Sequence, residues 1–413
     1  MNAKKYRFCI VTYETFPNPI TQNLKTFLLE NYSCDLIYIL HPQLDLKEGY
    51  QMSSGFSWFK NNKLIQSKTA YHWKTSWPLL YIKDILYTLF WCLRFGKIDV
   101  YFAAGNLNPL AAILLREVGF VKEVIYQSVD YYPTRFQNSF LNWFYFRMDK
   151  LCVEWSDETW NVSSMIAQAR QKKMDMDPKI FNRQYTVPGC VWFHQVKRLP
   201  FAKVNRKKIV YRGVLLPFMG VDLVIRAMPH ILKEIPSLIF EIVGTGVEEE
   251  KLKNLAKSLK VSKSVIFHGF VKGRENMEKV LSDAALGIAT FNTDILDDKV
   301  KNSDPGKIKD YMLLGMPIIT TKAFPGSKYI VKNRCGLIVS YRAEDLAKTI
   351  LGLLQNKNLL KEYRENVVKY IEKFDCVTIL ERNIERVLNG KVNTTNDRSA
   401  TSIKNFQNRF DDL

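Results

Sequence analysis

The sequence has little histidine, little cysteine and no long apolar run, and each of these absences excludes a class of protein. The five histidines show no metal-ligand spacing, and the seven cysteines contain no Cys-x-x-Cys pair, so neither a zinc site nor a disulfide framework is expected. No segment reaches the about 18 uncharged apolar residues that a membrane-spanning helix requires. The apolar run after Lys4, Lys5 and Arg7 ends at Glu14 and is too short for a signal peptide, which predicts a cytoplasmic protein.

Acidic residues are scarce relative to basic ones. The 413 residues include 60 Lys and Arg against 41 Asp and Glu, a formal net charge of +19. We therefore expect an anionic partner, which is a nucleic acid, a phosphate-bearing ligand or an acidic membrane surface. Hydrophobic residues make up 47%, which is enough for packed cores and excludes a disordered chain. The length fits two domains of roughly 200 residues each.

Short apolar segments alternate with amphipathic segments along the chain. Runs rich in Val, Ile and Leu are typical of parallel strands covered on both faces. This pattern predicts an α/β protein with two doubly wound, Rossmann-like parallel-sheet domains that face a central cleft. Their boundary is expected within 188–206, a polar and basic stretch interrupted by proline and glycine. Strands are predicted at 7–12, 35–40, 100–103, 123–127, 158–161, 208–211, 239–243, 265–268, 286–290, 317–320 and 337–339, with helices between them.

The segment 303–321 combines features that suit a phosphate and a ribose. Pro305 and Gly306 open a helix whose free N–H groups form an anion site. Lys307 lies in the first turn, where the helix dipole disfavours a cation unless an anion is present. Asp310 lies three residues further on nearly the same face, and its carboxylate could accept hydrogen bonds from a diol. The alternative is a surface helix with an incidental Lys–Asp pair.

This segment resembles the donor site of GT-B-fold glycosyltransferases of the retaining, family-4-like group, the glycosyl transferases group 1. Their hallmark is Glu-x7-Glu followed by Gly-x-Pro, and here Gly315 and Pro317 follow the helix. The resemblance covers 187–372 well and the first half only as a general architecture. Further matching segments lie at 187–191, 211–213, 220–227, 242–246, 265–271 and 282–288.

Two acidic positions of the family motif are altered. The second glutamate corresponds to Asp310, a shorter acid that is still able to hold ribose hydroxyls. The first corresponds to Asn302, which is not an acid, and the nearby Asp304 is a candidate substitute at a different spacing. The resemblance therefore implies a nucleotide-sugar site with a changed set of ligands.

Two basic positions are altered as well. The arginine and lysine that clamp the diphosphate in the family correspond to the neutral Val214 and Met219. Lys307 is the best compensating cation, and Arg212 is a weaker candidate, because a strand residue two places from Val214 points to the same face. These losses also keep a catalytically silent homologue open as an alternative.

The resemblance further implies donor contacts from the loops that follow two strands. Gly244, Thr245 and Gly246 would let the backbone approach the donor, or they form only a tight strand–helix turn. Phe270 would lie beside the nucleotide base, or it only packs. A nicotinamide site is not expected, because Glu249 occupies the third glycine position of that fingerprint. The predicted donor-binding residues are Arg212, Gly213, Gly244, Thr245, Gly246, Phe270, Asn302, Ser303, Asp304, Pro305 and Gly306.

The first half contains a basic and aromatic stretch at 51–98. It suits either nucleic-acid bases or a membrane interface, and we favour an anionic membrane, because no nucleic-acid motif accompanies it. Tyr81, Leu86 and Phe90 are predicted to pack in the core. The loop 56–77 shows neither helical nor strand periodicity and is predicted to form the surface contact.

Asp130 follows a predicted strand and would face the crevice where the reacting sugar lies. A turn or helix-capping role is the alternative. Gly105 and Asn106 follow the preceding strand and suit acceptor or sugar contact. With Lys307 and Asp310, Asp130 completes the predicted catalytic set.

The resemblance implies a hexosyltransferase-like enzyme that moves a sugar from a nucleotide-diphosphate sugar to a lipid-linked or polysaccharide hydroxyl. Retention of configuration is expected, with no metal or other cofactor and with an anionic membrane, not a nucleic acid, as partner. The alternatives are a silent homologue that binds a nucleotide sugar or glycan, a sugar-nucleotide epimerase and, from charge alone, a nucleic-acid-binding protein. Four segments are predicted: an acceptor-side domain over 1–190, a donor domain over 191–374, a helix over 375–390 that crosses back, and a disordered tail over 391–413.

Overall fold

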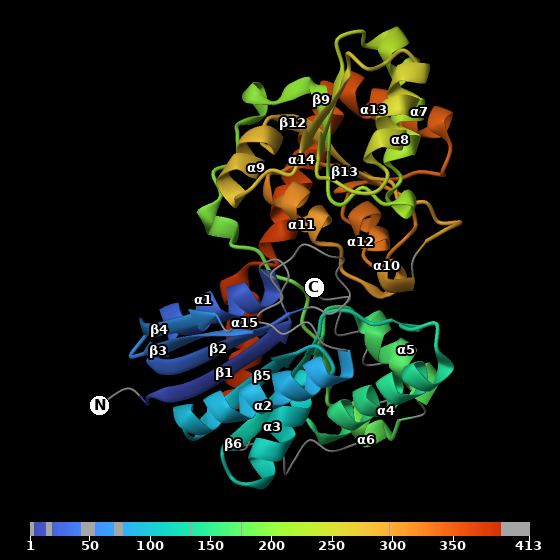
Figure 1. Ribbon diagram of the computed structural model, residues 1–413. Helices are drawn as coiled ribbons and strands as arrows, with labels where there is room; N and C mark the ends of the chain where they lie inside the picture. The colour runs from blue at the N-terminus through green and yellow to red at the C-terminus, as the bar shows by residue number, and fades with distance from the viewer. Residues whose placement is uncertain are drawn as a thin grey trace. The chain divides into compact units, whose positions relative to one another are not determined.

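The computed structural model describes residues 4–13, 19–42, 54–69, 77–132, 134–174, 176–296 and 298–389. The chain forms two compact units, each with its own sheet (Figure 1). Unit 1 comprises residues 1–190 and 376–413, and unit 2 comprises residues 191–375. The predicted tail at 391–413 and the aromatic residues of 70–76 lie outside the described residues.

Unit 1 is built on an eight-stranded sheet with the order β4-β3-β2-β1-β5-β6-β7-β8. All neighbouring strands from β2 to β8 run parallel, and β1 lies between β2 and β5, with Cys9 opposite both Ile37 and Tyr101. These three side chains are fully buried, because both faces of the sheet are covered. The strands are β1 (Tyr6–Tyr13), β2 (Cys34–His41), β3 (Gly55–Lys60), β4 (Lys63–Thr69), β5 (Ile98–Ala104), β6 (Val121–Ser128), β7 (Glu158–Asn161) and β8 (Gln184–Thr186).

The strands β3 and β4 form an antiparallel hairpin at the edge of this sheet. Asn61 and Asn62 join them with φ angles of 49° and 65°. Two consecutive left-handed residues are typical of the type I′ hairpin turn, which asparagine tolerates. The prediction that 56–77 lacks strand structure is therefore wrong for residues 56–69. In the sequence, the pair Asn61-Asn62 is the feature that indicates this hairpin.

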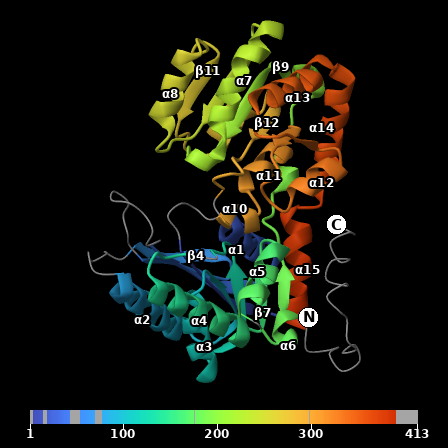
Figure 2. The ribbon, with the colours of Figure 1, turned by 90° about the vertical axis from the view of Figure 1, so that its right-hand side faces the viewer.

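Helices cover both faces of the unit 1 sheet (Figures 1 and 2). α1 and α15 pack together on one face, while α2, α3 and α4 lie side by side on the other. Leu86 and Phe90 of α2 are 60% and 54% exposed, so the prediction that they pack in the core is wrong. The helices are α1 (Pro19–Asn31), α2 (Trp77–Phe95), α3 (Asn108–Glu117), α4 (Ser139–Trp155), α5 (Ser164–Met174), α6 (Pro178–Phe181) and α15 (Cys376–Asn389).

A disulfide joins Cys190 to Cys376, with 4.8 Å between their Cα atoms. The sequence analysis, which expects no disulfide framework, did not foresee this single bridge. The two residues are 186 positions apart, and cysteine spacing alone cannot reveal a bridge that only the fold brings together. Arg386 of α15 also donates to Glu158 Oε2 at 2.7 Å, so the C-terminal helix is held to unit 1 by a covalent and an ionic link.

Unit 2 contains a six-stranded parallel sheet with the order β11-β10-β9-β12-β13-β14. Ile209 of β9 packs into one hydrophobic cluster with α7 and α13, and the next residue, Val210, packs into a second cluster with α11 and α14. The strands are β9 (Asn205–Arg212), β10 (Ile239–Val243), β11 (Val265–Gly269), β12 (Ala284–Ala289), β13 (Ile318–Thr320) and β14 (Gly336–Ile338). The helices are α7 (Val221–Glu234), α8 (Glu249–Ser258), α9 (Arg274–Leu281), α10 (Asp298–Asn302), α11 (Gly306–Leu313), α12 (Ser327–Lys332), α13 (Ala343–Gln355) and α14 (Lys357–Glu372).

Both sheets are doubly wound, as the strand–helix alternation predicts. In each sheet the strand order reverses at one point, which lies between β1 and β5 in unit 1 and between β9 and β12 in unit 2. Ligands of such sheets bind beyond the carboxyl ends of the strands at this reversal. None of the helices in the described part of the chain combines the length and the apolar character needed to cross a membrane.

Candidate functional site

Three loops of unit 2 meet at the carboxyl edge of its sheet, beyond β9, β10 and β11. The Gly213 N–H donates to Val243 O at 2.9 Å, and the Gly244 N–H donates to Gly269 O at 2.8 Å. The Leu215 N–H donates to Thr245 O at 2.9 Å. The structure thus brings together Gly213 and the Gly244–Gly246 segment, all of which the sequence predicts as donor-binding.

The glycines of these loops are required by the close approach of two backbones. Gly244 has a φ angle of 135°, and a Cβ atom there would lie 2.0 Å from Gly213 O. A Cβ atom on Gly246 would lie 2.2 Å from Leu215 O. The tight strand–helix turn therefore explains these glycines without a ligand, and it also leaves the loop backbone bare at the sheet edge.

We predict that Gly244→Ala lowers the free energy of unfolding by about 2 to 4 kcal/mol, because both the positive φ and the 2.0 Å approach oppose a methyl group. The matched control is Gly352→Ala in α13, where an added Cβ meets nothing within 4 Å and which should stabilise by about 0.5 to 1 kcal/mol. Urea unfolding measures both changes. Equal effects of the two substitutions would contradict the packing argument.

Lys307 lies at the strand-order reversal of unit 2, in the first turn of α11. Its Nζ atom is 3.1 Å from Tyr211 Oη and 3.3 Å from Met219 Sδ, and it lies 5.0 Å from the ring centroid of Phe291. Burial, assisted by the positive charge of Arg212, lowers the pKa of this amine to about 7. The amine thus reaches the side chain of Met219, the position where the family resemblance implies a lysine.

Asp310 is held by Arg212, the last residue of β9. The Arg212 guanidinium forms an ion pair with the Asp310 carboxylate, and the Arg212 N–H donates to Tyr311 Oη at 2.6 Å. Burial raises the pKa of Asp310, and the neighbouring Arg212 opposes that rise. These contacts fasten α11 to β9, and the Lys307 amine lies near enough to this pair for the charge of Arg212 to lower its pKa.

The predicted donor-binding residues just before α11 make other contacts. Asn302 ends α10 and is buried, and the Ser303 hydroxyl donates to Val300 O at 3.1 Å. The Asp304 carboxylate forms an ion pair with Lys309. Asp304 is therefore paired with a residue of α11, the helix that follows it. Pro305 caps α11 without a side-chain hydrogen bond, and Gly306, the first residue of α11, is exposed.

Phe270 and Thr245 lie at the surface of the loops that follow β11 and β10. Phe270 is 64% exposed, so core packing does not explain this aromatic residue. Thr245 is also exposed. Both residues thus lie at the carboxyl edge of the unit 2 sheet, where ligands of doubly wound sheets bind.

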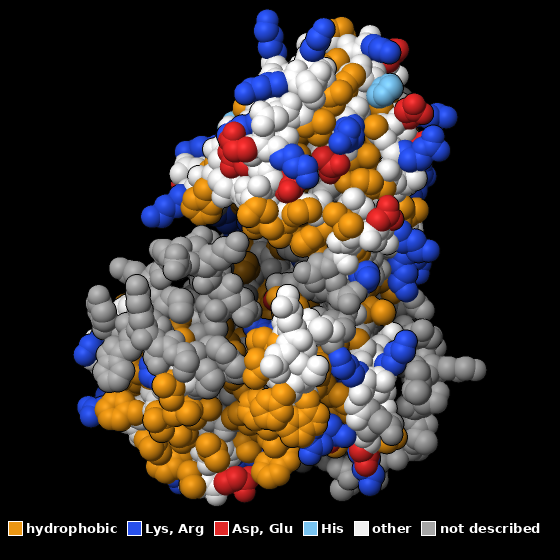
Figure 3. Space-filling view, turned by 45° about the vertical axis from the view of Figure 1, so that its right-hand side comes forward, with side chains coloured by type: hydrophobic (Ala, Val, Ile, Leu, Met, Phe, Trp, Pro, Cys, Tyr) orange, Lys and Arg blue, Asp and Glu red, His pale blue; other side chains and the backbone are white. Residues whose placement is uncertain are grey.

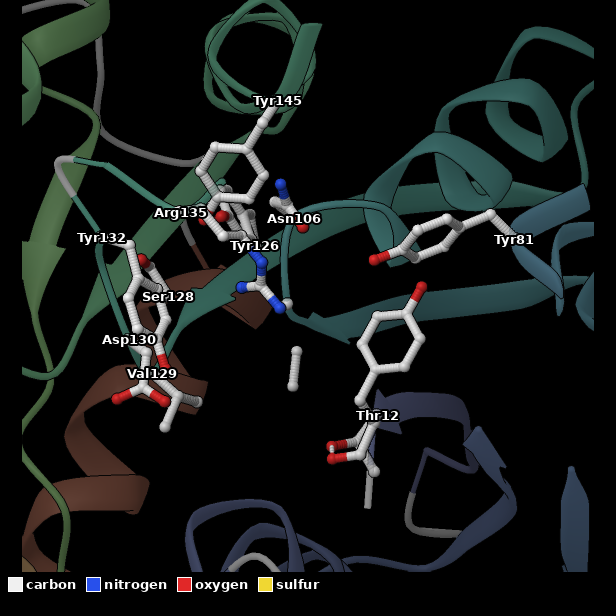
Figure 4. A pocket seen from close by; sticks show the side chains of 13 residues that line it. Thr12, Tyr81, Asn106, Tyr126, Ser128, Val129, Asp130, Tyr132, Arg135 and Tyr145 are labelled. Carbon is white, nitrogen blue, oxygen red and sulfur yellow. Dashed lines mark hydrogen bonds between the residues drawn. The ribbon is translucent and has the colours of Figure 1, made fainter. Parts of the chain in front are cut away.

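Unit 1 has a pocket at its own strand-order reversal (Figure 4). It is lined by Thr12 and Tyr13 at the end of β1, by Gly105 and Asn106 after β5, and by Asp130 after β6. Its empty volume is about 760 Å³, including the space at its open mouth. Asp130 thus lies where the sequence predicts, at a strand end and in a pocket. It belongs to unit 1, whereas Lys307 and Asp310 belong to unit 2.

Arg135 is a pocket residue that the sequence analysis missed. Its guanidinium carbon lies 5.1 Å and 5.3 Å from the ring centroids of Tyr132 and Tyr145. The backbone N–H of Arg135 donates to Asn142 Oδ1 at 2.9 Å. Figure 4 shows the guanidinium pointing into the pocket between Asp130 and the opposite wall. The loop that carries Arg135 has no periodicity, so no sequence signal placed this cation.

The pocket also presents neutral polar groups. Among the described residues, Asn106 Nδ2 is buried and has no hydrogen-bond acceptor. The Tyr81 hydroxyl lies on the wall opposite Asp130 (Figure 4), and Tyr13 also lines the pocket. Hydroxyls, an amide donor, a carboxylate and a guanidinium around one cavity suit a ligand with several hydroxyl groups.

Residues 196–374 match the family model of glycosyl transferases group 1. An uncharacterized glycosyltransferase of Haemophilus influenzae is 26% identical over 182 residues, which cover 44% of this chain and 48% of that protein. The chain thus spans about half the length of this relative. An uncharacterized glycosyltransferase of Methanocaldococcus jannaschii is 22% identical over 380 residues, which cover 87% of this chain and 90% of that one.

Solved structures agree on the architecture. The crystal structure of HepE from Anabaena in complex with UDP matches with a TM-score of 0.65 and 13% sequence identity, over 93% of this chain and 100% of that chain. This likeness shows the fold, which is α/β with two Rossmann-like domains. The family match covers residues 196–374, which lie in unit 2, and the whole chain shares the GT-B fold of this structure.

Proposed function

We propose that this chain transfers a sugar from a nucleotide-diphosphate sugar to a hydroxyl of a glycan or lipid-linked acceptor, with retention of configuration and without a metal or other cofactor. One observation carries the proposal: a buried lysine, Lys307, lies at the carboxyl edge of a doubly wound sheet with no anionic partner among the described residues. A buried cation is costly unless an anion accompanies it. A diphosphate supplies that anion.

In the proposed reaction, the donor site of unit 2 stabilises the charge of the leaving group. As the bond between sugar and diphosphate breaks, negative charge grows on the leaving oxygen. Lys307 and the N–H groups that begin α11 stabilise that charge, and Arg212 adds a second cation. Asp310 accepts hydrogen bonds from the ribose, and Phe270 stacks on the base.

The acceptor is assigned to the pocket of unit 1. Tyrosine rings and hydroxyl groups suit the mixed apolar and polar faces of a sugar, and Asp130 orients a hydroxyl of the acceptor. Arg135 supplies a positive charge for an acceptor that carries phosphate. We further propose that the protein works in the cytoplasm, peripheral to the inner membrane face.

Thermal unfolding with a panel of nucleotide sugars tests the donor assignment, because a ligand that binds only the folded state raises the unfolding midpoint. UDP sugars come first, since the similar fold of HepE was crystallised with UDP. We expect one nucleotide sugar to stabilise the protein and its nucleoside diphosphate to compete. If no nucleoside diphosphate stabilises the protein, the donor site is wrong. The anomeric configuration of the product, measured by NMR, tests retention.

A catalytically silent homologue is the second candidate, because Val214 and Met219 replace two cations and Val214 is 54% exposed. A silent protein would bind the nucleotide sugar without hydrolysing or transferring it. A sugar-nucleotide epimerase would instead convert the donor without any acceptor. Product analysis with and without acceptor separates these three outcomes.

Asp130→Asn is expected to lower transfer about 100-fold and Arg135→Met about 10-fold, while donor affinity stays within about twofold of wild type. The reason is that both side chains line the unit 1 pocket, whereas the donor cluster is built from unit 2 residues. Steady-state transfer kinetics and calorimetric donor binding measure the two effects. Loss of donor binding in both variants would remove the acceptor assignment.

A further inference from the structure

The helix α2 presents an apolar face to solvent. Leu79, Ile82, Leu86, Phe90 and Leu93 recur every three or four residues and are 54%, 54%, 60%, 54% and 48% exposed. A surface helix of a soluble domain normally places polar residues on this face and apolar residues toward the core. This helix also buries an inner apolar face, so its outer face is apolar in addition to its packing surface.

The apolar surface continues over the two neighbouring helices. Phe140, Trp143 and Trp155 of α4 are 67%, 57% and 48% exposed, and Leu114 of α3 and Val118 just beyond its end are 53% and 66% exposed. α3 packs against both α2 and α4, so the three helices lie side by side. Figure 3 shows hydrophobic side chains gathered over this part of unit 1. Monomeric proteins rarely expose so large an apolar surface unless a partner or a membrane covers it.

The exposed charges of α2 and α4 are all positive. Arg94 and Arg147 are exposed on α2 and α4, and Arg94 lies over the Phe90 ring at 5.9 Å. The carboxylates of these two helices are either buried, as Asp84 and Asp149 are, or half-buried beside a lysine, as Glu154 is. One exposed acid, Glu117, ends α3.

We propose that the outer faces of α2, α3 and α4 form a docking surface for an anionic lipid bilayer. Exposed leucine and phenylalanine side chains enter the acyl region, tryptophan suits the interface, and arginine pairs with lipid phosphate. The net charge of +19 adds a long-range attraction to the same partner. The residues of this surface lie at 79–155, outside the 56–77 loop that the sequence analysis favoured.

The test is co-sedimentation of the full chain with vesicles, in the absence of donor and acceptor. The lipid mixtures are phosphatidylglycerol with phosphatidylcholine, and phosphatidylcholine alone. We expect the wild type to bind the anionic vesicles at least about tenfold more strongly than the neutral ones. The triple variant Leu86→Gln, Phe90→Gln, Trp143→Gln should lose this binding by about tenfold or more.

The matched control changes three exposed apolar residues of unit 2, Ile295→Gln, Val331→Gln and Ile338→Gln, and should bind vesicles like the wild type. Circular dichroism and nucleotide binding verify that both triple variants are folded. Wild-type-like vesicle binding by the α2–α4 variant would overturn the proposal. It is equally overturned if the wild type binds no vesicles and instead dimerises through this face in sedimentation experiments. Because no reaction is measured, failure here leaves the proposed transfer activity standing.

Discussion

Replacing Lys307 by methionine is expected to weaken binding of a nucleoside diphosphate about 10- to 100-fold and to lower kcat/KM for transfer about 100- to 1000-fold. Methionine keeps an unbranched apolar side chain but removes the charged amine, which lies 4.5 Å and 5.0 Å from the ring centroids of Tyr211 and Phe291. The larger effect falls on transfer, because the charge on the leaving diphosphate grows in the transition state. Calorimetry measures the first change and initial rates measure the second.

The pH dependence of binding provides a sharper signature of the same residue. Burial lowers the Lys307 pKa from 10.5 to about 7, so in the free protein the amine loses its proton as the pH rises through 7. A diphosphate binds best to the protonated amine, and donor affinity should therefore fall above pH 7, by at most tenfold per pH unit. Binding should take up protons. In Lys307→Met both effects should disappear.

The lowered pKa of Lys307 also determines how the free energy of unfolding depends on pH. Between pH 7 and pH 10.5 the unfolded chain holds the Lys307 proton and the folded protein does not, so this group makes the free energy of unfolding rise with pH in that window. Its cost to stability is fully present below pH 7. Lys307→Met should therefore be more stable than the wild type at pH 7. A variant that is less stable there would show that the amine already has a partner in the folded protein.

Lys309→Met is the matched control, since Lys309 lies in the same helix and is equally buried but pairs with Asp304 and lies over the Phe374 ring. Its donor affinity should stay within about twofold of wild type, with an unchanged pH profile. Equal losses in both variants would mean that α11 tolerates no substitution. The assignment of Lys307 to the diphosphate would then lose its support.

Arg170→Met is expected to lower the free energy of unfolding by about 3 to 5 kcal/mol. Arg170 is fully buried in unit 1, where Nε donates to Asp149 Oδ2 at 2.7 Å and the terminal nitrogens donate to Asn161 Oδ1 and Ser128 Oγ, each at 2.7 Å. Removing the cation leaves the Asp149 carboxylate buried, where it still accepts a hydrogen bond from the neutral Tyr126 hydroxyl. Urea unfolding measures the loss.

Two further variants make this result specific. Arg170→Met combined with Asp149→Leu removes both charges and should recover much of the loss, because an apolar pair can replace a buried ion pair. Arg334→Met breaks an exposed pair with Glu362 and should cost less than about 1 kcal/mol. If the double variant is as unstable as Arg170→Met, the buried charge of Asp149 is not the cause.

The family resemblance and the local sequence patterns predicted more of unit 2 than of unit 1. Strand β9 and helix α11 lie close to their predicted positions, and Arg212 of β9 forms an ion pair with Asp310 of α11. This succeeded because parallel strands end at one edge of a sheet, so residues that follow different strands are brought together by topology alone. Asp304 illustrates the limit, since its ion pair with Lys309 depends on side-chain directions.

In unit 1 the sequence placed the parallel strands and helices but not the character of their surfaces. Leu86 and Phe90 were predicted as core residues because apolar side chains usually pack inward, and the structure exposes them. Arg135 was missed because a loop residue has no periodicity from which its direction can be inferred. The hairpin at β3 and β4 was missed because its turn, not its strands, carried the signal.

The sequence by itself determined the two doubly wound units, since the alternation of strand and helix periods is a local property of the chain. It also determined the candidate donor residues, through their positions after strands and through the family resemblance. Only the tertiary structure decided that the Lys307 amine reaches Met219 and that Cys190 meets Cys376. Such contacts between distant segments, and the exposure of the outer face of α2, depend on which elements pack against each other, and no local pattern encodes that choice.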